Sequence, residues 1–155
     1  MSSAAIEALT SAGVTHRVVR HPPVHSVSEA AEAAGVTVAD VIKTIVVRRA
    51  ADDFVFVLVP GDRAISWPKL RAVLGVHRLS LPDAGAAMDA TGYERGTITP
   101  FGASTAWPVV ADERVVGRTI RIGAGERDAA VVLAADDVLR VLDASVADVT
   151  DLAPS

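Results

Sequence analysis

The pattern of apolar and polar residues most strongly indicates β-structure between residues 41 and 59. Val41 to Arg49 and Phe54 to Val59 are rich in β-branched residues, and the four residues between them are small or acidic. This pattern predicts the two strands of a hairpin. Shorter apolar stretches predict further strands at His16 to His21, His77 to Leu81, Val109 to Ala111, Thr119 to Ile122, Ala129 to Leu133 and Val146 to Val149.

Helices are predicted where capping residues flank alanine- or leucine-rich stretches. Ser26 and Glu29 have the spacing of a capping box, and Gly35 supplies a stop. Ser66 offers a helix N-cap before Trp67 in the same way. The predicted helices are Ala4 to Ala12, Ser28 to Ala34, Trp67 to Leu74, Asp83 to Thr91 and Asp136 to Leu142.

The order of these elements predicts an α+β fold. Strands outnumber helices and the two types alternate irregularly, which favours a mixed, barrel-like sheet surrounded by short helices. A chain of 155 residues has the usual length of one domain, so we expect a single domain over residues 1–155. Half of the residues are hydrophobic but only 4% are aromatic, so the core must consist mainly of Val, Ala, Leu and Ile.

Composition narrows the possible functions and locations. The chain has no cysteine, which excludes disulfides, thiolate catalysis and cysteine-ligated metals. No apolar run approaches the roughly 20 residues that span a bilayer, and residues 1–7 lack a basic and apolar leader, so we expect a soluble, cytoplasmic protein without membrane contact. A net charge of −4 argues against a protein that coats nucleic acid, but it allows local contact with one end of an RNA.

Lys43 stands out because it lies in the predicted strand Val41 to Arg49. The two-residue period of a strand places Lys43 on the same, more apolar face as Ile45 and Val47. An ammonium group there needs a carboxylate, a ligand phosphate or a carbonyl oxygen as its partner. Two other roles are open: the charge protects an edge strand, or its head reaches back to water.

Other constellations are less specific. The stretch from Gly92 to Gly102 contains three glycines and a proline, so it is either a loop whose amides approach a ligand or an ordinary surface turn. His21 and His25 are separated by two prolines, which prevents the helical geometry of a paired-histidine metal site. No serine lies in a nucleophile elbow. We therefore expect neither a metal nor another cofactor.

Taken together, several short motifs resemble the YbaK and prolyl-tRNA synthetase insertion-domain family of aminoacyl-tRNA editing deacylases. The resemblance covers roughly residues 14 to 150 and is most specific in the lysine strand followed, at this distance, by the glycine-rich loop. The motifs are His21-Pro22-Pro23, Ile42-Lys43-Thr44, Val59-Pro60-Gly61-Asp62, Leu74-Gly75, Thr91-Gly92-Tyr93, the run from Gly96 to Gly102, and Ala124-Gly125.

This resemblance implies a function and a set of site residues. Members of the family remove small wrong amino acids from tRNA, chiefly from tRNA for proline, which implies contact with the acceptor end of aminoacyl-tRNA and with prolyl-tRNA synthetase. It implies catalytic roles for Lys43 and Gly96, although many relatives have a second glycine where this chain has Thr97. The substrate-binding residues that it implies are His21, Thr44, Thr97, Pro100, Phe101 and Gly102. The alternative is a non-catalytic module that binds an aminoacyl or nucleotide group in the same cleft.

Overall fold

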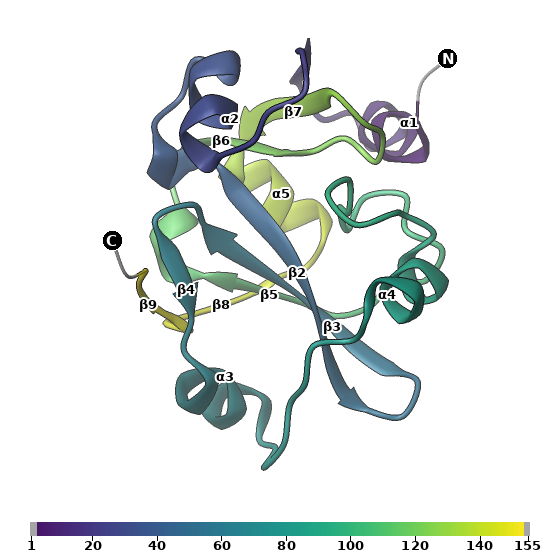
Figure 1. The fold of residues 1–155 in the computed structure, drawn as a ribbon, viewed down its shortest axis with the longest axis vertical. Coiled ribbons are helices and arrows are strands. Elements are labelled where there is room, and N and C mark those ends of the chain that lie inside the picture. The colour runs from purple at the N-terminus through teal and green to yellow at the C-terminus, as the bar shows by residue number, and fades with distance from the viewer. Residues whose placement is uncertain (1–2, 154–155) are drawn as a thin grey trace.

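The predicted hairpin between residues 41 and 59 forms the centre of the fold. In the computed structural model, which describes residues 3–153, β2 (Ile42–Ala50) and β3 (Asp53–Pro60) pair antiparallel, with Thr44 opposite Leu58. β5 (Val109–Asp112) pairs parallel with β3, and β8 (Ser145–Ala147) pairs parallel with β5. The order β2-β3-β5-β8 leaves β2 as an edge strand (Figure 1).

Two smaller sheets complete the β-structure. β1 (His16–Arg20), β7 (Ala129–Ala134) and β6 (Thr119–Gly123) form an antiparallel sheet in the order β1-β7-β6. β4 (Arg63–Ile65) and β9 (Thr150–Leu152) form a short antiparallel pair. In Figure 1 the three-stranded sheet lies above the four-stranded one, so edge strands of the two sheets approach each other.

Short helices surround the sheets. They are α1 (Ala4–Ser11), α2 (Val27–Ala34), α3 (Trp67–Leu74), α4 (Ala84–Thr91) and α5 (Ala135–Val141), with 3-10 turns η1 (Val38–Asp40) and η2 (Glu113–Val115). Ser26 caps α2 by accepting from the Glu29 amide, and Gly35 ends it at φ 70°. The Glu29 carboxylate accepts from the His25 amide rather than closing the box on Ser26.

Buried aliphatic residues on both faces hold the central hairpin in register. Ile42, Val46 and Phe56 belong to the larger core cluster, between the hairpin and the three-stranded sheet. Val47 and Val57 belong to a second cluster on the opposite face, together with Leu70 of α3 and others. A one-residue slip of β2 would exchange these two faces, so burial on both sides fixes which way each β2 side chain points.

The predicted α+β class is confirmed, with the strands divided among three sheets. The strand predicted at His77 to Leu81 is wrong: only Ser80 forms a bridge, to Arg48. The strand predicted at Val146 to Val149 overlaps β8 only, at residues 146 and 147, and β4 and β9 were not predicted.

The predicted single domain over residues 1–155 includes Met1, Ser2, Pro154 and Ser155, which lie outside the described residues. Among the helices of residues 3–153, none has the length and apolar character needed to cross a bilayer.

Candidate active site

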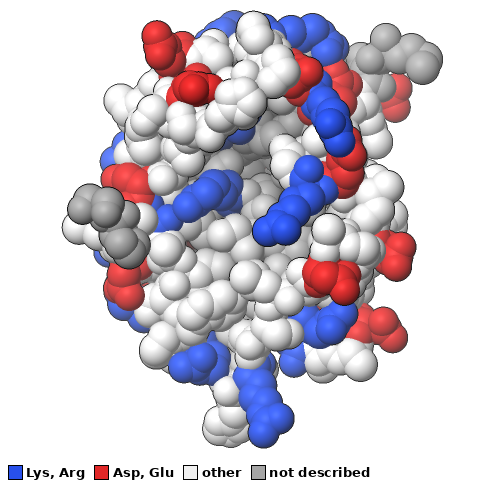
Figure 2. Space-filling view, in the orientation of Figure 1, with Lys and Arg blue, Asp and Glu red and all other residues white. Residues whose placement is uncertain are grey.

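A pocket of about 410 Å³ opens where the edges of the two larger sheets separate. Val41, just before β2, forms a parallel bridge with Arg121 of β6, and beyond this bridge the two strands part. Figure 2 shows the molecule hollowed near the centre of this face, with Lys and Arg side chains bordering the hollow. The lining residues are 41–46, 81–84, 87, 95, 96, 98, 121 and 123.

The open edge of β2 turns backbone polar groups toward this pocket. Arg48 exchanges both of its backbone hydrogen bonds with Ser80, which lies away from β3. The two-residue period of the strand then directs the backbone N–H and C=O groups of Thr44 and Val46 away from β3 as well. Both residues line the pocket. A ligand in the pocket can therefore pair with a strand edge as well as with side chains.

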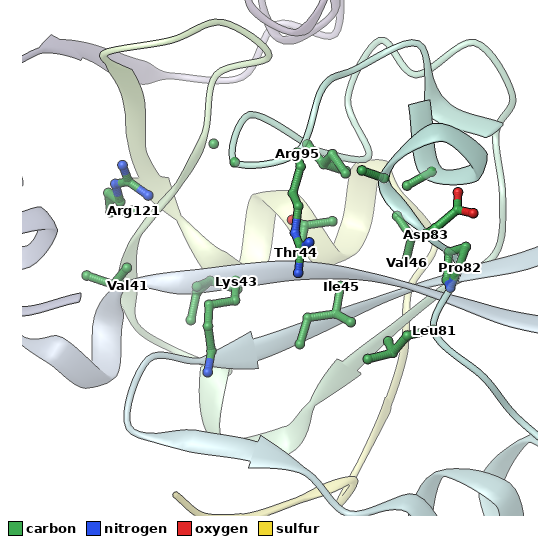
Figure 3. Close-up of a pocket in the computed structure, with 16 residues that line it drawn as sticks. Val41, Lys43, Thr44, Ile45, Val46, Leu81, Pro82, Asp83, Arg95 and Arg121 are labelled. Carbon is green, nitrogen blue, oxygen red and sulfur yellow. The ribbon is translucent and has the colours of Figure 1, made fainter. Parts of the chain in front are cut away.

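Lys43 lies at the pocket wall, with its ammonium group hydrogen-bonded to protein. Its Nζ donates to the Arg63 carbonyl oxygen at 2.8 Å, one of the three partner types expected from sequence. Figure 3 shows the side chain directed toward β4, on the same side of β2 as Ile45 and away from Thr44. Partial burial lowers the pKa of Lys43, and the nearby charge of Asp62 opposes that shift.

Gly96 also lines the pocket, at the tip of a turn. The Thr97 amide and hydroxyl both donate to the Glu94 carbonyl oxygen, which closes the turn. Gly96 is exposed at φ 91°, and an added Cβ would meet no atom within 4 Å. Its glycine is therefore required by backbone conformation and not by crowding inside the protein.

The remaining predicted loop residues lie behind the pocket rather than in its wall. Phe101 is buried in the main core, and its carbonyl oxygen accepts from the Tyr93 hydroxyl at 2.7 Å. Pro100 beside it is buried as well. Gly102 is packed so closely against α1 that a Cβ would lie 2.5 Å from the Ala4 carbonyl carbon. These contacts hold the loop in place, so its pocket-facing tip rests on a fixed base.

Of the eight predicted site residues, the structure brings three together in the pocket wall: Lys43, Thr44 and Gly96. His21 lies outside it, at the end of β1, where its amide donates to the Asp128 carbonyl oxygen. The roles assigned to all eight residues stay predictions.

The charged groups around the pocket are mainly cationic. Arg95 reaches over it from the loop, Arg121 flanks it from β6, and Lys43 lies below β2 (Figure 3). Asp83, at the start of α4, is its one lining carboxylate among the described residues. The chain as a whole carries a net charge of −4, so this site is locally opposite in sign to the molecule. Such a site favours an anionic ligand.

Comparison with known families decides the identity of this domain. The model of the aminoacyl-tRNA editing domain matches residues 21–141, which is most of the chain. The chain belongs to this family.

Relatives of this editing domain include whole synthetases and small separate proteins. It is 35% identical over 91 residues to the proline–tRNA ligase of Thermosipho africanus, covering 59% of this chain and 16% of the ligase. It is 29% identical over 129 residues to a proposed Cys-tRNA(Pro)/Cys-tRNA(Cys) deacylase, EbsC, of Enterococcus faecalis, covering 81% and 77% of the two chains. The chain thus spans about a sixth of the ligase and most of EbsC.

A solved structure extends this similarity to the fold of the editing domain. A proposed trans-editing enzyme for prolyl tRNA synthetase superimposes with a TM-score of 0.88 and 25% sequence identity. The superposition covers 97% of this chain and 99% of that one.

Sequence reasoning missed two arginines of the editing-domain pocket, Arg95 and Arg121. Arg121 lies between Ile120 and Ile122, so the signal that drew attention to Lys43, a lone cation in an aliphatic strand, was present there too. No three His, Asp or Glu side chains among residues 3–153 are placed to hold a metal ion.

Proposed function

We propose that this editing domain hydrolyses the ester that links a small, wrong amino acid to the 3′ end of tRNA, chiefly tRNA for proline, as a separate trans-acting deacylase. The observation that carries the proposal is the pocket of this editing domain: it is lined by an open strand edge and by three cations. These features suit a ligand that has both an aminoacyl carbonyl and phosphates.

The reaction requires little of the side chains. Water adds to the ester carbonyl carbon, the carbonyl oxygen becomes an oxyanion, and the bond to the ribose oxygen breaks as that oxygen takes up a proton. Backbone N–H groups facing the pocket can donate to the oxyanion, as such donors do in other acyl-transfer sites. In this scheme Lys43 adds a positive charge beside them.

A second basic surface supports an RNA partner. The basic groove consists of Arg48, Arg49, Arg71, His77 and Arg78, and it lies beside the segment that leads into the pocket at Leu81. Arg49 is paired with Asp53, but Arg71 and Arg78 form no ion pair with any residue from 3 to 153. Figure 2 shows Lys and Arg side chains again at the lower end of the hollowed face. The phosphates of the tRNA acceptor end are anions that such a basic groove can bind.

One observation favours the non-catalytic alternative. The lining residues include no acid and base pair, and the Lys43 ammonium is already hydrogen-bonded to Arg63. A module that only holds an aminoacyl or nucleotide group would need no acid, no base and no free ammonium group.

A panel of charged tRNAs separates the two functions. The purified protein is incubated with each aminoacyl-tRNA, and loss of the ester is followed against the uncatalysed rate. We expect fast deacylation of tRNA for proline that carries a small wrong amino acid, with correctly charged prolyl-tRNA spared. Binding of charged tRNA without loss of any ester would reject the proposed hydrolase in favour of the binding module.

A further inference from the structure

Arg121 is a partly buried cation without a partner in the part of the chain that the structure describes. Its neighbours Ile120 and Ile122 are 1% and 2% exposed and face the main core, so Arg121 faces the opposite side of β6. Its Nε atom is buried and has no hydrogen-bond acceptor among residues 3–153. No carboxylate in that range forms an ion pair with it, whereas its neighbour Arg118 is paired with Asp40 at 2.8 Å.

An unpaired donor in this position is costly for the folded protein. Burial without an acceptor destabilises a polar group, and it destabilises a cation more. Burial also lowers the pKa of Arg121, with no charge partner opposing it. Arg121 nevertheless lines the pocket, so a ligand in the pocket can supply the missing acceptor.

A second buried polar atom without a partner belongs to the same pocket. The Thr44 hydroxyl has no hydrogen-bond partner among the described residues, and Thr44 also lines the cavity. The structure has only four such atoms within residues 3–153, and these two belong to residues of the pocket wall. Their coincidence in one cavity indicates polar contacts that the ligand completes.

The two ends of the pocket differ in polarity, which orients the ligand. Arg121 lies at the Val41 end of β2, while Leu81 and Pro82 lie on the far side of Ile45, toward Val46 (Figure 3). The ends, at Val41 and Val46, are five residue steps apart along the strand, or roughly 17 Å. The apolar end suits the side chain of a small amino acid, and the Arg121 end suits an anion.

The guanidinium group narrows the choice of anion. Its planar fork matches the two oxygens of a phosphate or a carboxylate. In the ester substrate of the proposed function the carboxylate of a small amino acid is consumed in the ester bond, so the available anions are phosphates. The nearest phosphate to the ester is the one on the 5′ oxygen of the terminal nucleoside.

We propose that Arg121 forms a phosphate subsite that holds the 5′-phosphate of the terminal nucleotide, while the Thr44 hydroxyl contacts the same ligand further along β2 and the aminoacyl group lies toward Leu81. The inference rests on the proposed function, because it assigns one part of that substrate to one part of the same pocket. Arg121 is a binding residue in this scheme and takes no part in bond breaking.

The test uses two small esters that differ by one phosphate: 3′-O-aminoacyl adenosine 5′-monophosphate and 3′-O-aminoacyl adenosine. They carry the amino acid that the tRNA panel identifies. For the parent, the phosphate should lower KM at least tenfold. Arg121→Gln should abolish this advantage, so that its KM values for the two esters become equal. An equal effect of Arg121→Gln on both esters, or no effect on either, overturns the subsite.

Matched variants distinguish the effect of losing the positive charge from the effect of losing folded protein. Arg118→Gln removes an arginine just before the same strand, outside this pocket, and should keep the tenfold advantage. Arg121→Lys keeps a positive charge and should retain part of it. If Arg121→Gln melts far below the parent, Arg121→Lys decides the question, and loss of the whole phosphate advantage in that folded variant would reject the proposed role of charge.

A binding measurement tests the phosphate subsite independently of ester hydrolysis. Calorimetry compares adenosine 5′-monophosphate with adenosine on the parent and on Arg121→Gln. The parent should bind the monophosphate more tightly than adenosine, even if it hydrolyses no ester. Arg121→Gln should bind the two ligands equally. If the parent binds the two nucleosides equally, the subsite is wrong, whether or not the chain deacylates tRNA.

Discussion

At the scale of single residues, Lys43 carries the sharpest prediction. Lys43→Ala should lower kcat/KM for deacylation on the order of 100-fold, a loss comparable with that of one oxyanion donor, because it removes the positive charge beside the backbone donors. The variant should stay folded, since its side chain contributes one hydrogen bond, to the Arg63 carbonyl, worth about 1 kcal/mol. Single-turnover kinetics and thermal melting measure the two effects.

The other lysine of the chain provides the control for Lys43. Lys69 pairs with Asp148 and Asp151 and does not line the pocket. Lys69→Ala should therefore deacylate at the parental rate. Full turnover by a folded Lys43→Ala protein would show that the ammonium has no catalytic role.

Gly96 tests whether the tip of the loop faces substrate. Gly96→Val introduces a branched side chain into open space at φ 91°, so it should both strain the backbone by about 1 kcal/mol or more and obstruct the pocket. Gly117 has φ 76°, also has no atom near an added Cβ, and lies outside the pocket. Gly117→Val should cost similar stability and leave deacylation unchanged. Equal activity of the two variants would remove Gly96 from the site.

Part of the site was predictable from single residues, and part was not. Lys43 was conspicuous because the chain contains only two lysines, whereas Arg121 is one of 13 arginines. Its importance depends on the absence of a nearby carboxylate, a three-dimensional property that strand periodicity does not report. In the same way, the period of β2 predicted which face of the strand Lys43 occupies. It could not show that the Lys43 ammonium would donate to the Arg63 carbonyl oxygen.

At the scale of elements, Asp112 links segments that are too short to be stable alone. Its fully buried carboxylate accepts from the Val149 amide and the Thr150 hydroxyl and pairs with Arg114. Asp112→Ala should lower the free energy of unfolding by about 3 kcal/mol or more, because these buried donors lose their acceptor. Urea denaturation measures the loss.

An exposed ion pair offers the comparison for Asp112. Asp137 pairs with Arg140 across a turn of α5 at the surface, so Asp137→Ala should cost less than about 1 kcal/mol. If the two alanine variants lost equal stability, Asp112 would not hold these segments together.

The same contacts explain which elements the sequence predicted. Helices with their own caps, such as α2 between Ser26 and Gly35, follow from local signals. β4, β8 and β9 have three residues each, too few for a period, so they form through distant partners: β4 pairs with β9, β8 pairs with β5, and Asp112 accepts from Thr150 of β9. Residues 77–81 have strand-like composition, but Leu81 is 59% exposed and the one bridge at Ser80 does not propagate.

At the scale of the whole molecule, the first prediction concerns metal ions. The chain lacks cysteine, and its described His, Asp and Glu residues form no metal-binding group, so deacylation should survive exhaustive chelation. Because magnesium also folds tRNA, the measurement uses the small aminoacyl adenosine ester. Loss of that activity in EDTA, restored by zinc or magnesium, would contradict the expectation.

The charge distribution makes the second whole-molecule prediction. If the basic groove contacts phosphates, replacing Arg71 and Arg78 with Gln should reduce the slope of log kcat/KM against log salt by about 1.5, or roughly 0.7–0.9 per contact. Activity on the small ester should not change. Arg20→Gln with Arg140→Gln removes the same charge elsewhere and should leave the slope intact. An unchanged slope in the groove variant would place the RNA on another surface.

The open edge of β2 also has a consequence for how such a pocket evolves. The direction of a backbone N–H follows from the pleat of the strand, so no single substitution at Thr44 or Val46 can turn it away from the ligand. Side chains at the rim, such as Leu81 at the apolar end, can be exchanged one codon at a time. A lineage can therefore acquire a new substrate by changing the rim while it inherits the hydrogen-bonding edge, and the chemistry persists as the sequence drifts.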